Sequence, residues 1–483
     1  MLRKLSALLV AWLCYATTLA QSLQPGTVKI TAQLIHADSS TPRAMVFNFL
    51  NPFIRLRKSA AFDEQNQLAS SGEMIFTQNM TIQYNNTFIN LYVQPGDSVH
   101  LLIDGALLKK KNFEWLSIGG DHATESTQVN LWHHYFSRYT SKAFQQAGSV
   151  TTMKDSAAME YARCLAMLEN YSKQHPLLPA VKKWAAIDIR NTISYWASDN
   201  LTAKDSITGR LILNHALYRE PLFDQYNEAG FQSMMFPYHL ANYAHTLLKT
   251  DSSINNLQQQ GQYTKAAAQA LRLLSVEPKG LARDYMLFNF INMLLPKSPQ
   301  LTDSLPALPS LFHDTLAYAY LLQAADNIQR PVLNEKPVTG ISYFNDGRTE
   351  TVPPVKVLSY LAKKYPGKVL YIDIYATWCV PCFKEMEKMP EIKAGVDTSK
   401  IVFINLCLQS EMKTWSNLVN NKKHPGEHYF LDEDATKIFM GMYAIEGFPN
   451  YFLLNKKGQV ETLKAPRPSD GTLLINRLNR LIR

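Results

Sequence analysis

The sequence predicts a multidomain protein with an N-terminal β-sandwich-like module, an all-helical middle region and a C-terminal α/β domain. Three observations support this prediction. The chain has 483 residues, too many for one ordinary domain. Apolar and polar residues alternate up to about residue 118, and the apolar period then becomes helical. After about residue 350, strand and helix patterns follow one another. We therefore expect domains at 21–118, 119–335 and 336–483.

The composition is that of a globular protein, with 46% hydrophobic and 18% charged residues. The net charge is +9, but basic runs are as short as Lys109–Lys111. Such a diffuse charge favours solubility over nucleic-acid binding, so we expect no nucleic-acid partner.

Residues 1–20 have the features of a signal peptide. Arg3 and Lys4 precede an uncharged segment, Leu5–Leu19, and small residues lead to Ala20. Fifteen uncharged residues are short for a membrane span, which needs about 20. Cleavage after Ala20 is therefore favoured over a retained anchor. No later stretch is apolar enough to cross a membrane, so we expect a soluble, exported protein.

The first domain is predicted from alternating runs and a turn at Gln94–Asp97. Its polar side chains are explained by turns and surface positions, and none indicates catalysis. The best strand candidates are 27–35, 44–49, 87–93 and 98–103.

The middle region shows helical apolar spacing interrupted by prolines. Cys164 lies on one apolar helical face, which indicates a buried structural thiol. We expect the same of Cys407, which directly follows a predicted strand at 401–406.

The C-terminal domain begins after a turn-rich stretch. A helical face that includes Leu358 ends at Pro366-Gly367, and a strand at 369–375 follows. An amphipathic helix from about residue 412, a hairpin at 451–463 and a last helix bearing Leu474 complete the domain.

The chemistry is expected at Cys379 and Cys382, where this strand gives way to a helix. Free N–H groups at a helix start stabilise an anion, so Cys379 is predicted to be the exposed, attacking thiolate. Cys382 would be the buried resolving thiol. Pro381 suits an early helical position. A zinc site would need His424 and His428, but a Pro-Gly pair lies between them.

Asp373 lies in the middle of the strand, among tyrosines and isoleucines. A strand buried on both faces makes an ionised carboxylate costly, which raises its pKa. Such an acid can exchange a proton with Cys382. The alternative is a structural Asp that pairs within the sheet.

Gly447–Pro449 precedes the hairpin. A proline here can adopt the cis form and present the Phe448 backbone to a cysteine peptide.

With these features, the C-terminal region resembles the TlpA/ResA-like exported class of thioredoxin-fold disulfide oxidoreductases. The matching residues are Trp378-Cys-Val-Pro-Cys382, Asp373 and Gly447–Pro449. The resemblance implies a thioredoxin-like fold, a reversible Cys379–Cys382 disulfide, a cis Pro449 and Asp373 as buried proton acceptor.

It also implies that a cysteine-containing protein or small thiol is bound at Trp378, Pro381, Phe448 and Pro449, and that a membrane donor supplies electrons. No cofactor or metal is implied. The three-part layout and the segment Val93–Val99 resemble large envelope proteins of Gram-negative bacteria, which implies a periplasmic location.

Two positions depart from the family pattern. The helix proline appears late, as Pro390, and Phe403 is predicted to replace the lysine that often faces the buried acid. Loss of that cation should make Asp373 harder to ionise.

The preferred interpretation is an exported disulfide reductase. Val380-Pro381 supplies no histidine to stabilise the thiolate, so the potential should lie nearer about −270 mV than the about −120 mV of a strong oxidant. The alternative is an envelope binding protein whose β and helical domains bind a partner or ligand, with the last domain as scaffold. A peroxidase is less favoured, because peroxidatic cysteines usually lack a partner three residues on.

Overall fold

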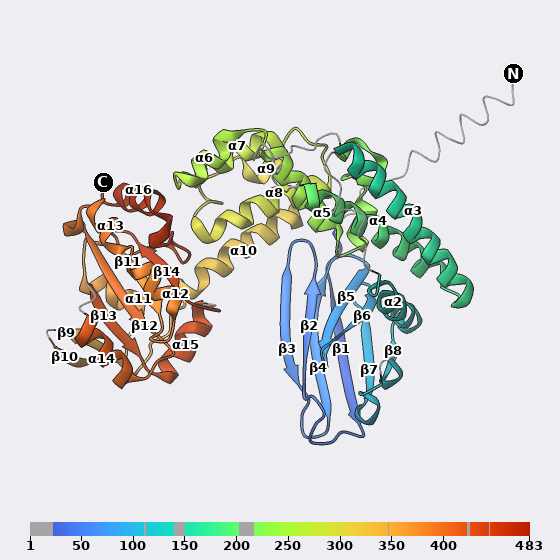
Figure 1. Ribbon diagram of the computed structural model, residues 1–483, viewed down its shortest axis with the longest axis horizontal. Coiled ribbons are helices and arrows are strands. Elements are labelled where there is room, and N and C mark those ends of the chain that lie inside the picture. Colours follow the sequence, from blue (N-terminus) through green and yellow to red (C-terminus); the bar gives the residue numbers. More distant parts are fainter. Residues whose placement is uncertain are drawn as a thin grey trace. The chain divides into compact units, whose positions relative to one another are not determined.

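The computed structural model describes residues 23–110, 113–139, 150–201, 217–345, 347–422, 426–443 and 445–483 (Figure 1). The predicted signal peptide at 1–20 lies outside these residues. The chain forms two compact units. The first extends to Thr250 and adds Leu273–Asn289 and Pro309–Tyr320; the second contains Asp251–Arg272, Phe290–Leu308 and Leu321–Arg483. The boundaries expected after residues 20, 118 and 335 remain predictions.

The β-rich part of the first unit is a sandwich, as the alternation predicted. Its two four-stranded sheets have the orders β4-β1-β7-β8 and β3-β2-β5-β6. Inward residues of both sheets, such as Ile30 and Phe47, form one core. The strands are β1 Gly26–Ile35, β2 Ala44–Leu50, β3 Arg55–Ala61, β4 Gln67–Met74, β5 Gln78–Tyr84, β6 Thr87–Val93, β7 Ser98–Asp104 and β8 Leu116–Gly120.

Along the chain, all described elements after strand β8 and before strand β9 are helices, which confirms the expected all-helical region. The α-helices are α2 Ala123–Phe136, α3 Val150–Gln174, α4 Pro179–Leu201, α5 Phe236–Leu248, α6 Ser252–Gln259, α7 Tyr263–Leu274, α8 Leu281–Leu294, α9 Leu308–Leu311 and α10 Thr315–Leu333. Cys164 is fully buried in α3, as expected of a structural thiol.

The C-terminal part is a seven-stranded mixed sheet with the order β10-β9-β13-β12-β11-β14-β15. The central strands β11, β12 and β13 are parallel, and β14 runs antiparallel to β11. The strands are β9 Ile341–Asn345, β10 Arg348–Val352, β11 Val369–Tyr375, β12 Ile401–Cys407, β13 Glu427–Leu431, β14 Asn450–Leu454 and β15 Val460–Thr462.

Helices cover both faces of this sheet. Ile372 and its neighbours pack with residues of α11 and α15 on one face. Tyr371 packs with residues of α13 and α16 on the other. The helices are α11 Val357–Lys364, α12 Val380–Met386, α13 Met389–Ala394, α14 Met412–Lys422, α15 Glu433–Tyr443 and α16 Thr472–Leu481. The central strand is therefore buried on both faces, as expected.

Three strands of this sheet were not anticipated. The hairpin β9–β10 lies at one edge of the sheet, where four of five β10 residues are exposed and show no alternation. Strand β13 has only five residues and is largely buried on both faces, so its sequence shows no apolar period of two.

Candidate active site

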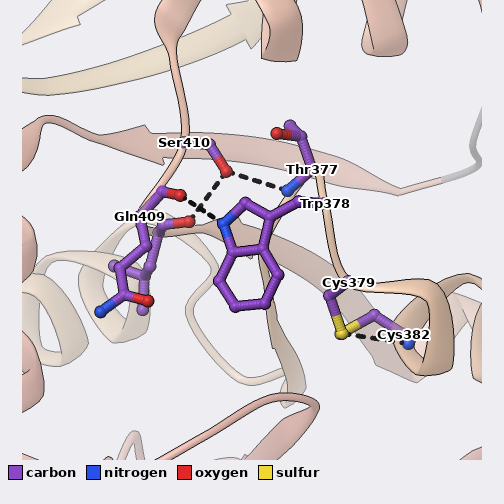
Figure 2. The surroundings of a disulfide bond; sticks show 7 residues. Thr377, Trp378, Cys379, Cys382, Gln409 and Ser410 are labelled. Atoms are coloured by element: carbon purple, nitrogen blue, oxygen red, sulfur yellow. Dashed lines mark hydrogen bonds between the residues drawn. A yellow bond between two sulfur atoms is a disulfide. The ribbon is translucent and has the colours of Figure 1, made fainter.

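The cysteine pair lies where β11 ends and α12 begins (Figure 2). Cys379 and Cys382 form a disulfide with a Cα–Cα distance of 5.4 Å. Cys379 is the N-cap of α12, and Pro381 lies in its first turn. The backbone N–H of Cys382 donates a hydrogen bond to Sγ of Cys379 over 3.2 Å. A negative charge on that sulfur would thus face a backbone donor at a helix start.

The expectation that Cys379 is exposed is wrong for this disulfide-linked form. Cys379 is 3% exposed and Cys382 is fully buried. Both belong to a cluster that also contains Trp415, and the Phe448 ring packs against it. Packing from elements distant in the sequence therefore covers the sulfur atoms. The two residues next to Cys379 in the sequence are the exposed ones: Trp378 is 61% exposed and Val380 is 64% exposed.

A loop after β12 holds the segment that precedes the cysteines. The indole Nε1 of Trp378 donates to the backbone oxygen of Gln409 over 2.7 Å, and the Thr377 N–H donates to Oγ of Ser410 over 2.9 Å (Figure 2). The Ser410 hydroxyl in turn donates to the Leu408 carbonyl. Although exposed, the indole of Trp378 is therefore fixed at one edge.

Gln409 and Ser410 were missed in the sequence. Their position after strand β12 was the only available signal. Loops that follow neighbouring parallel strands, such as β11 and β12, meet at the same edge of the sheet. The backbone of Gln409 is in the left-handed region, at φ 47°, which is uncommon for a residue other than glycine.

The Phe448–Pro449 peptide bond is cis, which confirms the form that the resemblance implied. The Phe448 ring contacts the Trp378 ring edge-on, with centroids 5.8 Å apart. The Gly447–Pro449 segment is thus brought to the cysteine pair, although it lies far along the chain.

Asp373 is 3% exposed, and in the described part of the protein neither carboxyl oxygen has a hydrogen-bond partner. Burial raises the pKa of this carboxyl well above its ordinary value, and the nearby Glu385 carboxylate adds to the rise. The predicted burial and direction of the pKa shift are confirmed. The role in proton transfer remains a prediction.

The prediction that Phe403 faces Asp373 from the neighbouring strand is wrong. Asn405 is the register partner of Asp373 in β12, and Phe403 pairs with Tyr371. Because side chains alternate along a strand, a two-residue error in register keeps the face but changes the neighbour. The neighbour is still uncharged, so no lysine occupies this position.

A cavity of about 730 Å³ adjoins Trp378. The loops before α14 and α15 and the first turns of both helices contribute most of its walls. Its lining residues are Thr377, Trp378, Gln409, Ser410, Glu411, Thr414, Leu431, Asp432, Glu433, Thr436, Lys437 and Met440.

The remaining described thiols are buried and free. Burial raises the pKa of Cys164 and of Cys407 to about 12. Cys407 lies in the same packed cluster as the disulfide. A thiol with so high a pKa is almost wholly protonated at neutral pH and is a poor nucleophile.

The zinc interpretation gains no support. His428 is buried in β13, and His424 lies outside the described residues. Within the described ranges, no three His, Cys, Asp or Glu side chains are grouped as metal ligands. In the same ranges, no helix has the length and apolar character needed to cross a membrane.

Comparisons with known proteins match the C-terminal region. Residues 367–460 match a family model described as thioredoxin-like. The chain is 29% identical over 98 residues to a thiol-disulfide oxidoreductase ResA of Bacillus thuringiensis, and 30% identical over 98 residues to that of Bacillus cereus. Each match covers 20% of this chain and 55% of the relative, so the chain spans about half the length of these relatives.

Among solved structures, the thioredoxin domain of a thiol-disulfide oxidoreductase from Bacteroides vulgatus is 19% identical. The match covers 31% of this chain and 95% of that one, with a TM-score of 0.25, too low to support an inference about function.

Proposed function

Because the C-terminal region is a thioredoxin-like disulfide oxidoreductase domain, we propose that this protein is an exported disulfide reductase that acts through Cys379 and Cys382. One observation carries the proposal: the two sulfurs are joined at the start of α12, where the Cys382 N–H donates to Sγ of Cys379. A pure scaffold would need neither the CxxC pair nor the buried acid Asp373 beside it in the sequence.

The reaction starts from the reduced pair. The Cys379 thiolate attacks one sulfur of a substrate disulfide, whose S–S bond breaks; the leaving sulfur takes a proton from water, and a mixed disulfide remains. Cys382 then transfers its proton to the ionised Asp373 carboxylate and attacks Sγ of Cys379. The second substrate sulfur leaves as a thiolate. The substrate gains two electrons, the enzyme pair is oxidised, and Asp373 releases its proton to solvent.

Trp378, Pro381, Phe448 and Pro449 are proposed to hold the substrate. The exposed indole and the adjoining ring of Phe448 provide an apolar contact beside the sulfurs. The backbone of Phe448, whose ring packs against the cysteine cluster, would pair with an extended cysteine peptide. The cavity beside Trp378 would take the residues that flank the substrate cysteine.

The substrates are proposed to be cysteine-containing proteins or small thiols in the periplasm, reached after cleavage behind Ala20. A membrane donor would return electrons to the oxidised pair. We assign no cofactor or metal to the reaction.

Turnover of insulin with dithiothreitol as reductant tests the proposal. The wild type should accelerate insulin precipitation, and Cys379→Ser should not exceed the rate without enzyme. Equal rates for both proteins would contradict the proposal and favour the envelope binding protein with a scaffold domain.

A further inference from the structure

Tyr451 lies directly beside the buried acid. It is the register partner of Asp373 in the antiparallel pair β11–β14. Directly opposed residues point to the same face, with Cβ atoms about 4.5–5.5 Å apart, which is within the reach of a tyrosine side chain. Tyr451 is 2% exposed. Tyr451 is therefore the residue directly opposite Asp373 on the same face of the sheet.

Both groups lack hydrogen-bond partners where the structure is described. The Tyr451 hydroxyl has none, and neither carboxyl oxygen of Asp373 has one. A buried polar group without a partner is costly, and an ionised carboxylate without a donor is more so. A hydroxyl donor and a carboxylate acceptor side by side can satisfy each other once the acid is ionised.

Two other polar side chains near this pair bear on the ionisation of Asp373. Glu385 of α12 is a second acid, and both of its oxygens accept hydrogen bonds from Ser469. Asn405, the partner in β12, has a buried amide nitrogen close to Gly426, and within the described residues this nitrogen also lacks a hydrogen-bond partner. The further titratable groups around the pair are Tyr371 and Tyr375 on β11, and Arg467 and Asp470 before α16. Cys382 of α12 packs in one cluster with Tyr375.

We propose that Tyr451 is a positioning residue whose hydroxyl donates a hydrogen bond to the ionised Asp373 carboxylate. This inference rests on the proposed function, in which Asp373 accepts the Cys382 proton. The Tyr451 phenol would stabilise the ionised Asp373 carboxylate in place of the lysine that the family pattern has beside the buried acid. A hydrogen bond to the charged form lowers the pKa of an acid, so Tyr451 offsets part of the rise that burial causes.

Tyr371 offers a matched control. Its ring stacks on that of Tyr451, with centroids 5.4 Å apart and an interplanar angle of 17°, and it is 1% exposed. Its hydroxyl, however, already donates to the Pro466 carbonyl over 2.9 Å. Loss of this hydroxyl should cost stability without removing a donor from Asp373.

The experiment compares Tyr451→Phe, Tyr371→Phe and the wild type, each as the full chain. The titration of Asp373 is followed in the reduced proteins by carbon NMR of labelled aspartate carboxyls, with Asp373→Asn to assign the signal. Tyr451→Phe should raise the pKa of Asp373 by about one unit, and Tyr371→Phe should leave it unchanged.

Rapid mixing then measures how fast the mixed disulfide is resolved at each pH. In Tyr451→Phe, resolution should be about tenfold slower near neutral pH and return to the wild-type rate at higher pH, because the ionised fraction falls tenfold per pKa unit. The same Asp373 pKa in Tyr451→Phe as in the wild type, or an equal rise in both variants, would overturn the inference. Failure of the wild type to reduce insulin would refute the proposed function, while the carboxyl titration would still decide whether Tyr451 donates to Asp373.

Discussion

The backbone N–H of Cys382 donates to Sγ of Cys379 over 3.2 Å at the first turn of α12. The same donor would face a thiolate after reduction and would stabilise the charged form of Cys379.

Alkylation of the reduced protein at mildly acidic pH should therefore label Cys379 first. Peptide mapping by mass spectrometry identifies the labelled residue. Preferential labelling of Cys382 would reverse the two roles. Cys379→Ser should abolish turnover, whereas Cys382→Ser should accumulate mixed disulfides with substrates, since attack can occur but resolution cannot.

Asp373→Asn removes the proton acceptor but keeps its shape. Resolution of the mixed disulfide should slow by about 10²–10⁴-fold near neutral pH, the usual contribution of a general base, while the first attack by Cys379 changes little. Stopped-flow kinetics of the two phases can measure this. An unchanged second phase would mean that the proton leaves by another route.

The same variant should change how stability depends on pH. The pKa of Asp373 is raised in the folded state, so above its ordinary value of 3.8 the folded state holds a proton that the unfolded state releases. The stabilising effect of this group is therefore complete below that value and is lost as pH rises through the folded pKa. Relative to Asp373→Asn, the wild type should lose free energy of unfolding from about pH 4 upward. Urea denaturation at several pH values tests this prediction, and parallel curves would refute it.

Trp378→Ala should weaken substrate binding more than it weakens the fold. The side chain is mostly exposed, so loss of its hydrogen bond to Gln409 should cost only about 1 kcal/mol of stability. Loss of the apolar contact should raise the KM for a cysteine peptide about tenfold, or about 1.4 kcal/mol. Trp378→Phe, which keeps an aromatic ring, is the control, and its KM should lie between the values of the wild type and Trp378→Ala. A fall in kcat at constant KM would argue against a binding role.

Cys164 and Cys407 should remain unmodified in the folded, reduced protein at pH 8. Both thiols are buried, and the pKa of each is raised to about 12. Iodoacetamide should reach them only after unfolding, whereas Cys379 reacts in the native state. A disulfide from Cys164 to Cys407 or Cys379 in the native oxidised protein would instead indicate a disulfide relay.

Much of the candidate site could be predicted because its signals are local. The run Val369–Tyr375 is buried throughout, and its position before Cys379 indicated a strand that leads into a helix start. Asp373 within that run had to be buried and hard to ionise. The edge strand β10 escaped prediction because its exposed residues leave no apolar period.

By itself, the sequence determined the strand, the helix start, the spacing of Cys379 and Cys382 and the burial of Asp373, because each depends on neighbours along the chain. Only the tertiary structure decided that Asn405 and Tyr451 flank the acid, since register between distant strands depends on the packing of the whole sheet. The burial of Cys379 is likewise a tertiary effect, because the ring of Phe448 that packs on its cluster arrives from a remote segment.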